Sequence, residues 1–296
     1  DHETLHTSPG DEIAEDPAAW AKTNTSNYRR SNTMKKQLIG MAVVAALGLS
    51  ANAHAITLDL FSSLDYQGVA DNTQDSTAVE SSVDAPTSRI LGGQRDISVN
   101  WLTGSATSGQ LANVTMEVGG TDGILSFSNS EGVGGEGVVQ WDGDDSGSLT
   151  LDPTGLGGID LWAFGPGITV QTLTADLNFP ISINAYTDAT HYTLVELLTT
   201  GPGTEFISFA ALEFSGFCDA PPAGITSVTC GSGGNVDMSN VGALEFIINV
   251  AGGTVAVDLS IGPPMVVPEP GVLGLLGAGL IGTMAARRRR SSGKKS

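Results

Sequence analysis

Lysine is missing from the whole middle of this 296-residue chain. Residues 56–267 hold no lysine, and their two arginines, Arg89 and Arg95, stand against 25 carboxylates, which gives a net charge of −23. Because contacts to phosphate need Lys and Arg, this composition excludes a nucleic-acid-binding protein. It also excludes Schiff-base chemistry and P-loop phosphate binding, since both need a lysine.

Most of the positive charge lies near the two ends. Met34, Lys35 and Lys36 precede a mostly apolar run at 38–49, and a small-x-small pattern with Ala53 and Ala55 follows. A charged segment, an apolar segment and a small-residue cleavage site are typical of a secretory signal peptide. The pattern therefore predicts a signal helix at 34–55, export by the general secretion machinery and cleavage after Ala55.

The residues before Met34 are polar and acidic, with no apolar period to bury. A secretory signal normally begins at the initiator methionine. We therefore interpret residues 1–33 as a disordered upstream extension, and a genuine disordered leader on a signal anchor is the alternative.

The C-terminal end has three parts in a fixed order. Pro268, Glu269 and Pro270 precede an apolar run at 271–286, and a basic cluster follows, made of Arg287, Arg288, Arg289 and Arg290. Sixteen residues at 1.5 Å each reach about 24 Å, less than the hydrocarbon core of about 30 Å. The pattern predicts a short transmembrane helix whose arginines stay on the cytoplasmic side.

Together these parts resemble the PEP-CTERM sorting signal of Gram-negative bacteria. The resemblance implies that an exosortase recognises Pro268, Glu269 and Pro270 and removes the tail. The tail would therefore anchor the protein in the inner membrane only transiently. The product is then released or transferred to the cell surface, typically in species that make extracellular polysaccharide. Residues 291–296 extend beyond the pattern without disturbing it.

The exported middle has the pattern of an all-β protein. Short segments of alternating or β-branched residues recur every 10–15 residues between Gly, Asp, Asn, Ser and Pro clusters. This spacing predicts a single sandwich or jelly-roll-like domain at 56–264, followed by the sorting tail at 265–296. The candidate strands are 56–61, 97–102, 113–118, 123–128, 137–141, 148–151, 159–164, 168–177, 181–186, 192–198, 205–214, 243–250 and 254–261.

Two cysteines, Cys218 and Cys230, enclose eleven residues. Export permits oxidation, and two cysteines allow one intramolecular pairing. We expect a structural disulfide worth about 3 kcal/mol in the chain-entropy model.

The densest acidic segment contains Asp142, Asp144 and Asp145, followed by Gly147. Oxygen ligands at alternate positions before a glycine resemble the start of a calcium loop, so calcium is the candidate cofactor. The twelfth position, however, is Pro153 in place of a bidentate glutamate. An Asp-Gly-rich hairpin turn is the other interpretation.

Other residues with catalytic chemistry are few. His191 is the only histidine after Ala55, with Asp188 three residues before it, and we expect it to be a surface or turn residue. Glu196 and Glu245 lie within apolar runs and are the best candidates for a glycosidase carboxylate pair, although outward-facing strand positions explain them as well. We predict no catalytic residue.

Arg89 and Arg95 flank Gly92 and Gly93. We expect both arginines to pair with carboxylates and to hold this turn, with Asp84 and Asp96 as the candidates near them in the sequence.

The sequence favours a non-enzymatic surface or extracellular-matrix protein with a structural or interaction role, linked to exopolysaccharide and biofilm. One alternative is a calcium-dependent carbohydrate-binding module, which needs exposed aromatics beside the acidic loop. Trp141 and Trp162 could stack on sugar rings, although Trp is more often a core residue. Another is a secreted glycosidase or esterase with a deep cleft. The net charge argues against adhesion to anionic polysaccharide unless a divalent ion bridges the two.

Overall fold

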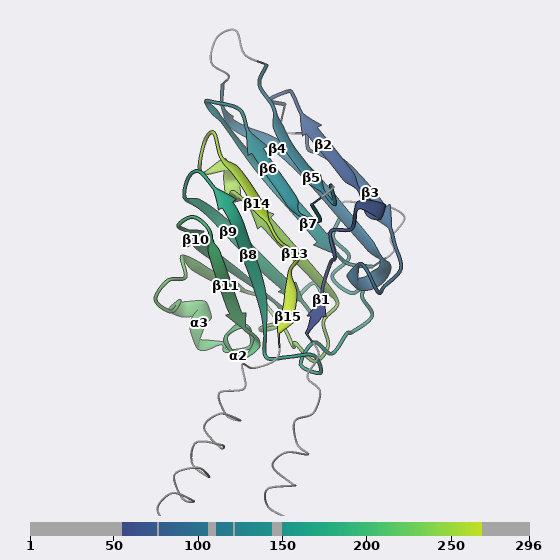
Figure 1. Ribbon diagram of the computed structural model, residues 1–296. Helices are drawn as coiled ribbons and strands as arrows, with labels where there is room; N and C mark the ends of the chain where they lie inside the picture. Colours follow the sequence, from purple (N-terminus) through teal and green to yellow (C-terminus); the bar gives the residue numbers. More distant parts are fainter. Residues whose placement is uncertain (1–54, 76, 106–110, 121, 144–149, 268–296) are drawn as a thin grey trace, which may run out of the picture. The chain divides into compact units, whose positions relative to one another are not determined.

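The chain folds into two antiparallel β-sheets packed face to face (Figure 1). The computed structural model describes residues 55–75, 77–105, 111–120, 122–143 and 150–267. The prediction of an all-β sandwich is confirmed. The expected signal helix, the extension at 1–33 and the C-terminal helix lie outside the described residues. No helix in the described part is both long and apolar enough to span a membrane.

The first sheet has eight strands. Along it, each strand pairs with its neighbour, and β11 (Gly203–Ser208) also pairs with β8. The order is β1 (Ile56–Thr57), β15 (Met265–Val267), β8 (Gly167–Ala175), β14 (Asp258–Ile261), β6 (Leu125–Asn129), β5 (Val114–Val118) and β2 (Gln67–Asp71).

The second sheet has seven strands. Their order is β12 (Ser227–Cys230), β10 (Tyr192–Thr199), β9 (Phe179–Tyr186), β13 (Ala243–Ile248), β7 (Val133–Trp141), β4 (Gln94–Gly104) and β3 (Val79–Asp84). Short helical turns connect strands of the sandwich: η1 (Ser63–Asp65), η2 (Leu91–Gly93), α2 (Phe209–Leu212), α3 (Gly216–Asp219) and η3 (Val250–Gly252).

Alternation along the strands separates the core from the outer faces. In β9, Ile181, Ile183 and Ala185 are buried in the hydrophobic core between the sheets. The intervening Ser182 and Asn184 point to the other side of the sheet because successive side chains alternate. The outer face of this sheet therefore receives polar residues from β9.

An ion pair is buried between the two sheets. Arg95 on β4 is fully buried, and its Nη1 lies 2.9 Å from Asp59 Oδ2. Its Nε also donates to Gln67 on β2, in the opposite sheet. Burial raises the pKa of Asp59, and the charge of Arg95 offsets part of that rise. This pair therefore joins the two sheets through polar contacts.

The second arginine also has a carboxylate partner. Arg89 Nε lies 2.8 Å from Asp65 Oδ2, in η1. The expectation that both arginines pair with carboxylates is confirmed, but the partners are Asp59 and Asp65, which lie far from them in sequence. Asp84 instead accepts a hydrogen bond from Gln94.

Several segments differ from the expected strands. Residues 150 and 151 of the expected strand 148–151 form no strand, and 254–261 is a strand only from Asp258. The first strand ends at Thr57, well before residue 61. Residues 159–164 mainly form turns. Within them, Leu161 is buried in the core, and its N–H donates to the Met238 carbonyl. Residues 205–214 form a strand and then α2, where Phe209 and Leu212, three apart, are both buried.

Strand β15 changes the boundary between domain and tail. The sequence pattern places residues 265–267 in the tail, but Val266 pairs with Ile168 of β8 and with Ile56 of β1. The sheet therefore continues up to the residue before Pro268.

The expected disulfide is present. Cys218 in α3 and Cys230 in β12 are bonded, with their Cα atoms 5.7 Å apart. It ties the segment after α2 to the edge strand of the seven-stranded sheet.

Candidate functional site

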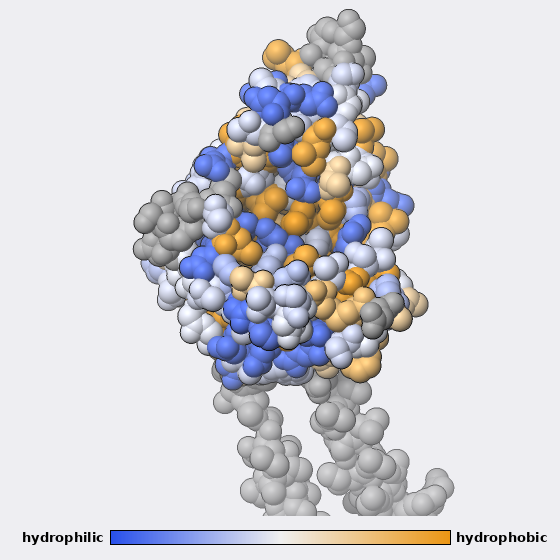
Figure 2. Space-filling model, turned by 180° about the vertical axis from the view of Figure 1, so that it is seen from behind, coloured by the Kyte–Doolittle hydropathy of each residue, from blue (hydrophilic) through white to orange (hydrophobic). Residues whose placement is uncertain are grey.

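The outer face of the seven-stranded sheet is hollowed, and polar and hydrophobic side chains mix along its floor (Figure 2). Register places Asp96, Gln140, Glu245 and Asn184 in one row across β4, β7, β13 and β9. Asp96, Gln140 and Asn184 are 0, 7 and 2% exposed. Polar residues this deeply buried are unusual for a face that only meets solvent.

Glu245 is the centre of this row. Its Oε1 accepts a hydrogen bond from Gln140 Nε2 at 2.9 Å. Its Oε2 accepts from Asn184 Nδ2 at 2.6 Å and from Tyr186 Oη at 3.3 Å. Three donors from two neighbouring strands thus fix the carboxylate in place. We call Gln140, Asn184, Tyr186 and Glu245 the Glu245 cluster.

One buried acceptor of the cluster has no partner. Gln140 donates through its amide nitrogen, and its Oε1 has no hydrogen-bond partner within the described residues. Leaving a buried acceptor unpaired costs free energy, about 1–3 kcal/mol. An added hydroxyl or amide donor would remove that cost.

Aromatic surface adjoins the cluster. The rings of Tyr186 and Tyr192, which pair across β9 and β10, have centroids 5.6 Å apart at an interplanar angle of 44°. Burial, and secondly the charge of Glu245, raises the pKa of the Tyr186 phenol. Tyr186 therefore remains a neutral hydroxyl at ordinary pH.

A second carboxylate lies further along the same face. Glu136 on β7 accepts a hydrogen bond from the Ala251 N–H at 2.7 Å. Burial raises its pKa, and the charge of Glu245 adds to the rise. The face therefore presents mainly acceptors. Both arginines of the exported middle are engaged with Asp59 and Asp65.

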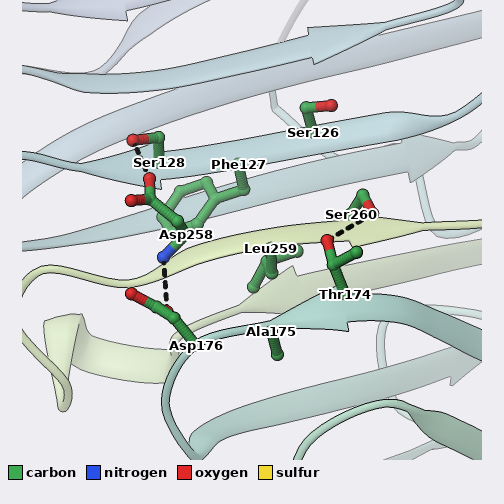
Figure 3. A pocket seen from close by; sticks show the side chains of 9 residues that line it. All are labelled: Ser126, Phe127, Ser128, Thr174, Ala175, Asp176, Asp258, Leu259 and Ser260. Carbon is green, nitrogen blue, oxygen red and sulfur yellow. Dashed lines mark hydrogen bonds between the residues drawn. The ribbon is translucent and has the colours of Figure 1, made fainter.

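The outer face of the eight-stranded sheet offers a different site. A depression of about 500 Å³ lies over β6, β14 and β8 (Figure 3). Ser128 donates to Asp258, the Asp258 N–H donates to Asp176, and Thr174 and Ser260 share a hydrogen bond of 2.6 Å. These polar groups are hydrogen-bonded to one another, so they offer fewer free donors and acceptors to a ligand than the Glu245 cluster does.

The two predicted carboxylates lie on the same face of the seven-stranded sheet, on strands that are not neighbours. Glu245 and Glu196 lie on β13 and β10 with β9 between them, and Glu196 pairs with Ser182 where Glu245 pairs with Asn184. Glu196 accepts a hydrogen bond from Ser227. Each carboxylate is therefore engaged with its own strand neighbours.

The two tryptophans do not form a sugar-stacking platform. Trp141 is 3% exposed and donates from Nε1 to Asp59 inside the sandwich. Trp162 is 38% exposed, donates to Glu213 and packs edge-on against Phe209. Trp141 is thus a core residue, the more frequent place for Trp, and it does not supply the exposed aromatic that the carbohydrate-binding alternative needs beside the acidic loop.

His191 is a turn residue, as expected. Its Nδ1 lies 3.0 Å from Asp188 Oδ2, and the Asp188 carboxylate accepts the backbone N–H groups of Thr190 and His191. These hydrogen bonds, first from Thr190 and then from His191, hold the pKa of Asp188 well below its usual range.

The calcium loop is only partly described. Asp144 and Asp145 lie outside the described residues. Asp142 is 1% exposed, and its Oδ2 accepts a hydrogen bond from the Asp152 N–H at 2.8 Å. No group of three metal-ligating side chains occurs among the described residues. Calcium binding stays a prediction.

Sequence reasoning found Glu245 but missed its partners. Asn184 and Tyr186 alternate with buried Ile183 and Ala185, and Gln140 lies between buried Val139 and Trp141. Period-two alternation could have placed all three on one outer face. Their meeting at Glu245 depends on strand order, which local pattern does not specify.

The predicted processing residues lie mostly beyond the described part. Ala53, Pro268, Glu269 and Pro270 fall outside it, as do Arg287, Arg288, Arg289 and Arg290. Ala55 is exposed, immediately before β1.

Comparison with known proteins gives one match by sequence. Residues 266–290 match the family model of the PEP-CTERM protein-sorting motif. No curated protein matches the chain. Among solved structures, a family 11 carbohydrate-binding module from Clostridium thermocellum, in complex with a beta-1,3-1,4-mixed-linked tetrasaccharide, is similar at 12% identity, 72% coverage of this chain, 95% coverage of that chain and a TM-score of 0.32. That score is too low to carry over its fold or its ligand. The chain thus carries a PEP-CTERM sorting signal at its C-terminus and is an exported protein marked for exosortase processing.

Proposed function

We propose that the exported domain is an interaction module of the cell surface or extracellular matrix, and that it binds a neutral polysaccharide on the outer face of its seven-stranded sheet. The unpaired Gln140 Oε1 beside Glu245 is the observation that carries this proposal. It is a buried acceptor, and its best partner is a hydroxyl donor.

The chemistry of the face selects the kind of ligand. Carboxylate and amide oxygens accept hydrogen bonds from sugar hydroxyls, and the Tyr186–Tyr192 pair offers aromatic surface to the apolar face of a sugar ring. The net charge of −23 on residues 56–267 disfavours an anionic polysaccharide. A neutral glycan meets both conditions.

The same geometry favours binding over hydrolysis. A glycosidase needs two carboxylates that face each other across the scissile bond. Glu245 is held by three donors, and β9 separates it from Glu196. A structural or interaction role linked to exopolysaccharide therefore fits these residues better than a secreted hydrolase.

The test is retardation of the full chain in native gels that contain a polysaccharide. Hydroxyethylcellulose and dextran are the neutral probes, and alginate is the anionic one. We expect retardation by at least one neutral probe, with EDTA present, and none by alginate. Glu245→Gln should weaken binding about tenfold, since the cluster loses acceptor capacity worth about 1.4 kcal/mol.

Glu117→Gln is the matched control. Glu117 is exposed on β5, in the other sheet, and its substitution makes the same change in charge. It should leave binding unchanged. Equal losses in the two variants, or no retardation of the wild type by either neutral probe, would contradict the proposal.

A further inference from the structure

One end of the sandwich collects exposed aromatic side chains. Trp162, Phe206 and Phe214 are 38, 50 and 55% exposed, and they are the most exposed Trp and Phe residues of the described part. Met265, 37% exposed, lies in the last strand. We call these four residues the aromatic end. Figure 1 shows α2, α3, the end of β15 and the start of β1 at this same end.

Two pairs of aromatic rings lie around α2. Trp162 packs against Phe209 with ring centroids 5.4 Å apart and donates to Glu213 at 3.0 Å. Phe214 follows Glu213 and packs edge-on against Phe217. One ring pair therefore joins the 159–166 loop to α2, and the other joins the residue after Glu213 to α3.

The same surface reaches the last strand of the sheet. Phe206 and Met265 lie on either side of Thr169, on β11 and β15. The Phe206 ring lies against Gly167, where a Cβ would come within 2.5 Å of Phe206 Cζ. Gly167 pairs with Val267, the last described residue. The aromatic end is thus built around the point where the tail leaves the sheet.

The chain leaves little distance between this end and the tail. Val267 is paired in the sheet, and the apolar run begins four residues later, at Gly271. Four extended residues span at most about 14 Å. While the apolar run is in the inner membrane, the aromatic end must therefore lie close to the bilayer surface.

We propose that, before the tail is cut, the aromatic end rests on the lipid surface, with Trp162, Phe206 and Phe214 in the head-group region. Trp and other large apolar side chains favour this region of a membrane. Attachment through the tail makes the contact intramolecular, so a weak apolar surface suffices. Exosortase cleavage removes that attachment and frees the domain.

The charge around the aromatic end specifies the lipid. Asp160, Glu205 and Glu213 are its nearest carboxylates in sequence, and residues 56–267 have a net charge of −23. Surfaces that bind anionic lipids carry Lys and Arg. We therefore expect a zwitterionic bilayer to hold this end better than an anionic one.

Trp162 is itself the reporter for the experiment. The full chain is reconstituted into phosphatidylcholine vesicles, with and without bromine on the upper acyl chains, and anchoring is checked by flotation. Bromine quenches tryptophan emission on contact. The tail holds no tryptophan, and the difference between wild type and Trp162→Phe isolates the Trp162 signal from Trp20, Trp101 and Trp141. We expect brominated lipid to quench that signal.

Two double variants test the surface. Phe206→Ser with Phe214→Ser should reduce the quenching of Trp162 at least about twofold, because the apolar area that meets the lipid is lost. Leu64→Ser with Leu111→Ser removes apolar residues that are 78 and 96% exposed outside the aromatic end, and it should leave quenching unchanged. Replacing part of the lipid with phosphatidylglycerol should also lower quenching.

Equal Trp162 emission in brominated and plain vesicles would overturn the proposal, as would equal effects of the two double variants. Neither result depends on the Glu245 cluster, so glycan binding is tested separately.

Discussion

Asp59 and Glu245 are two carboxylates that each accept hydrogen bonds from three groups, in different places. Asp59 lies between the sheets and accepts from Arg95, Trp141 and the Phe61 N–H. Glu245 lies on an outer face and accepts from Gln140, Asn184 and Tyr186. The first group includes a cation, and the second does not.

The presence or absence of a cation distinguishes a carboxylate that stabilises the fold from one that is suited to bind a ligand. Burying a charge is expensive unless an opposite charge compensates it, so the Asp59 site must keep Arg95 to hold the sheets together. The Glu245 cluster lies on an outer face, where Glu245 and Tyr186 are half-buried, and its carboxylate is held by neutral donors in place of a cation. It leaves an acceptor on Gln140 for an external donor. A compensated cluster stabilises the fold, whereas an incomplete one recruits a ligand.

Removal of Arg95 should give the largest effect. Arg95→Met leaves Asp59 buried without its cation, so we expect a loss of about 3–5 kcal/mol in the free energy of unfolding. Urea unfolding measures it. Arg89→Met, at a pair whose arginine is 29% exposed, should cost less. Equal losses in the two variants would show that burial does not distinguish these pairs.

Strand positions and their inner faces can be predicted from the sequence, but the contacts of the Asp59 site cannot. Alternation of Ile181, Ile183 and Ala185 identifies β9 and its inner face. Nothing local relates Arg95 to Asp59, 36 residues away. Their meeting requires the loop after β1 to fold over the end of β4, which is a tertiary effect.

The candidate site was predictable to a similar degree. Glu245 stands out as a carboxylate in an apolar run, and alternation places Asn184 on an outer face. The pairing of β13 with both β9 and β7 decides that Asn184 and Gln140 meet it. For Trp141 the sequence leaves core and sugar-stacking positions open, because an aromatic residue near a loop carries no sign of which face it occupies.

Loss of the disulfide should destabilise the fold by a smaller amount without affecting either cluster. Cys218→Ser with Cys230→Ser removes the bond between two residues that are twelve apart in the sequence. This should lower the free energy of unfolding by about 3 kcal/mol. Polysaccharide retardation in native gels should stay at the wild-type level, because the bond ties α3 to β12 and not to β13. A parallel loss of binding would mean that the Glu245 cluster depends on general stability.

The pH dependence of Glu136 should give the smallest effect. Burial and the charge of Glu245 raise its folded-state pKa above the ordinary 4.5, so the folded state holds a proton that the unfolded state has released. Stability from this group is therefore complete below pH 4.5 and is lost as pH rises through the folded-state value.

Glu136→Gln keeps an acceptor for the Ala251 N–H and should remove this part of the decline. Urea unfolding of both proteins from pH 4 to 7 measures the difference, which should widen with pH in favour of the variant. A difference that is constant across this range would mean that the folded-state pKa of Glu136 is not raised, and that neither burial nor the charge of Glu245 shifts it.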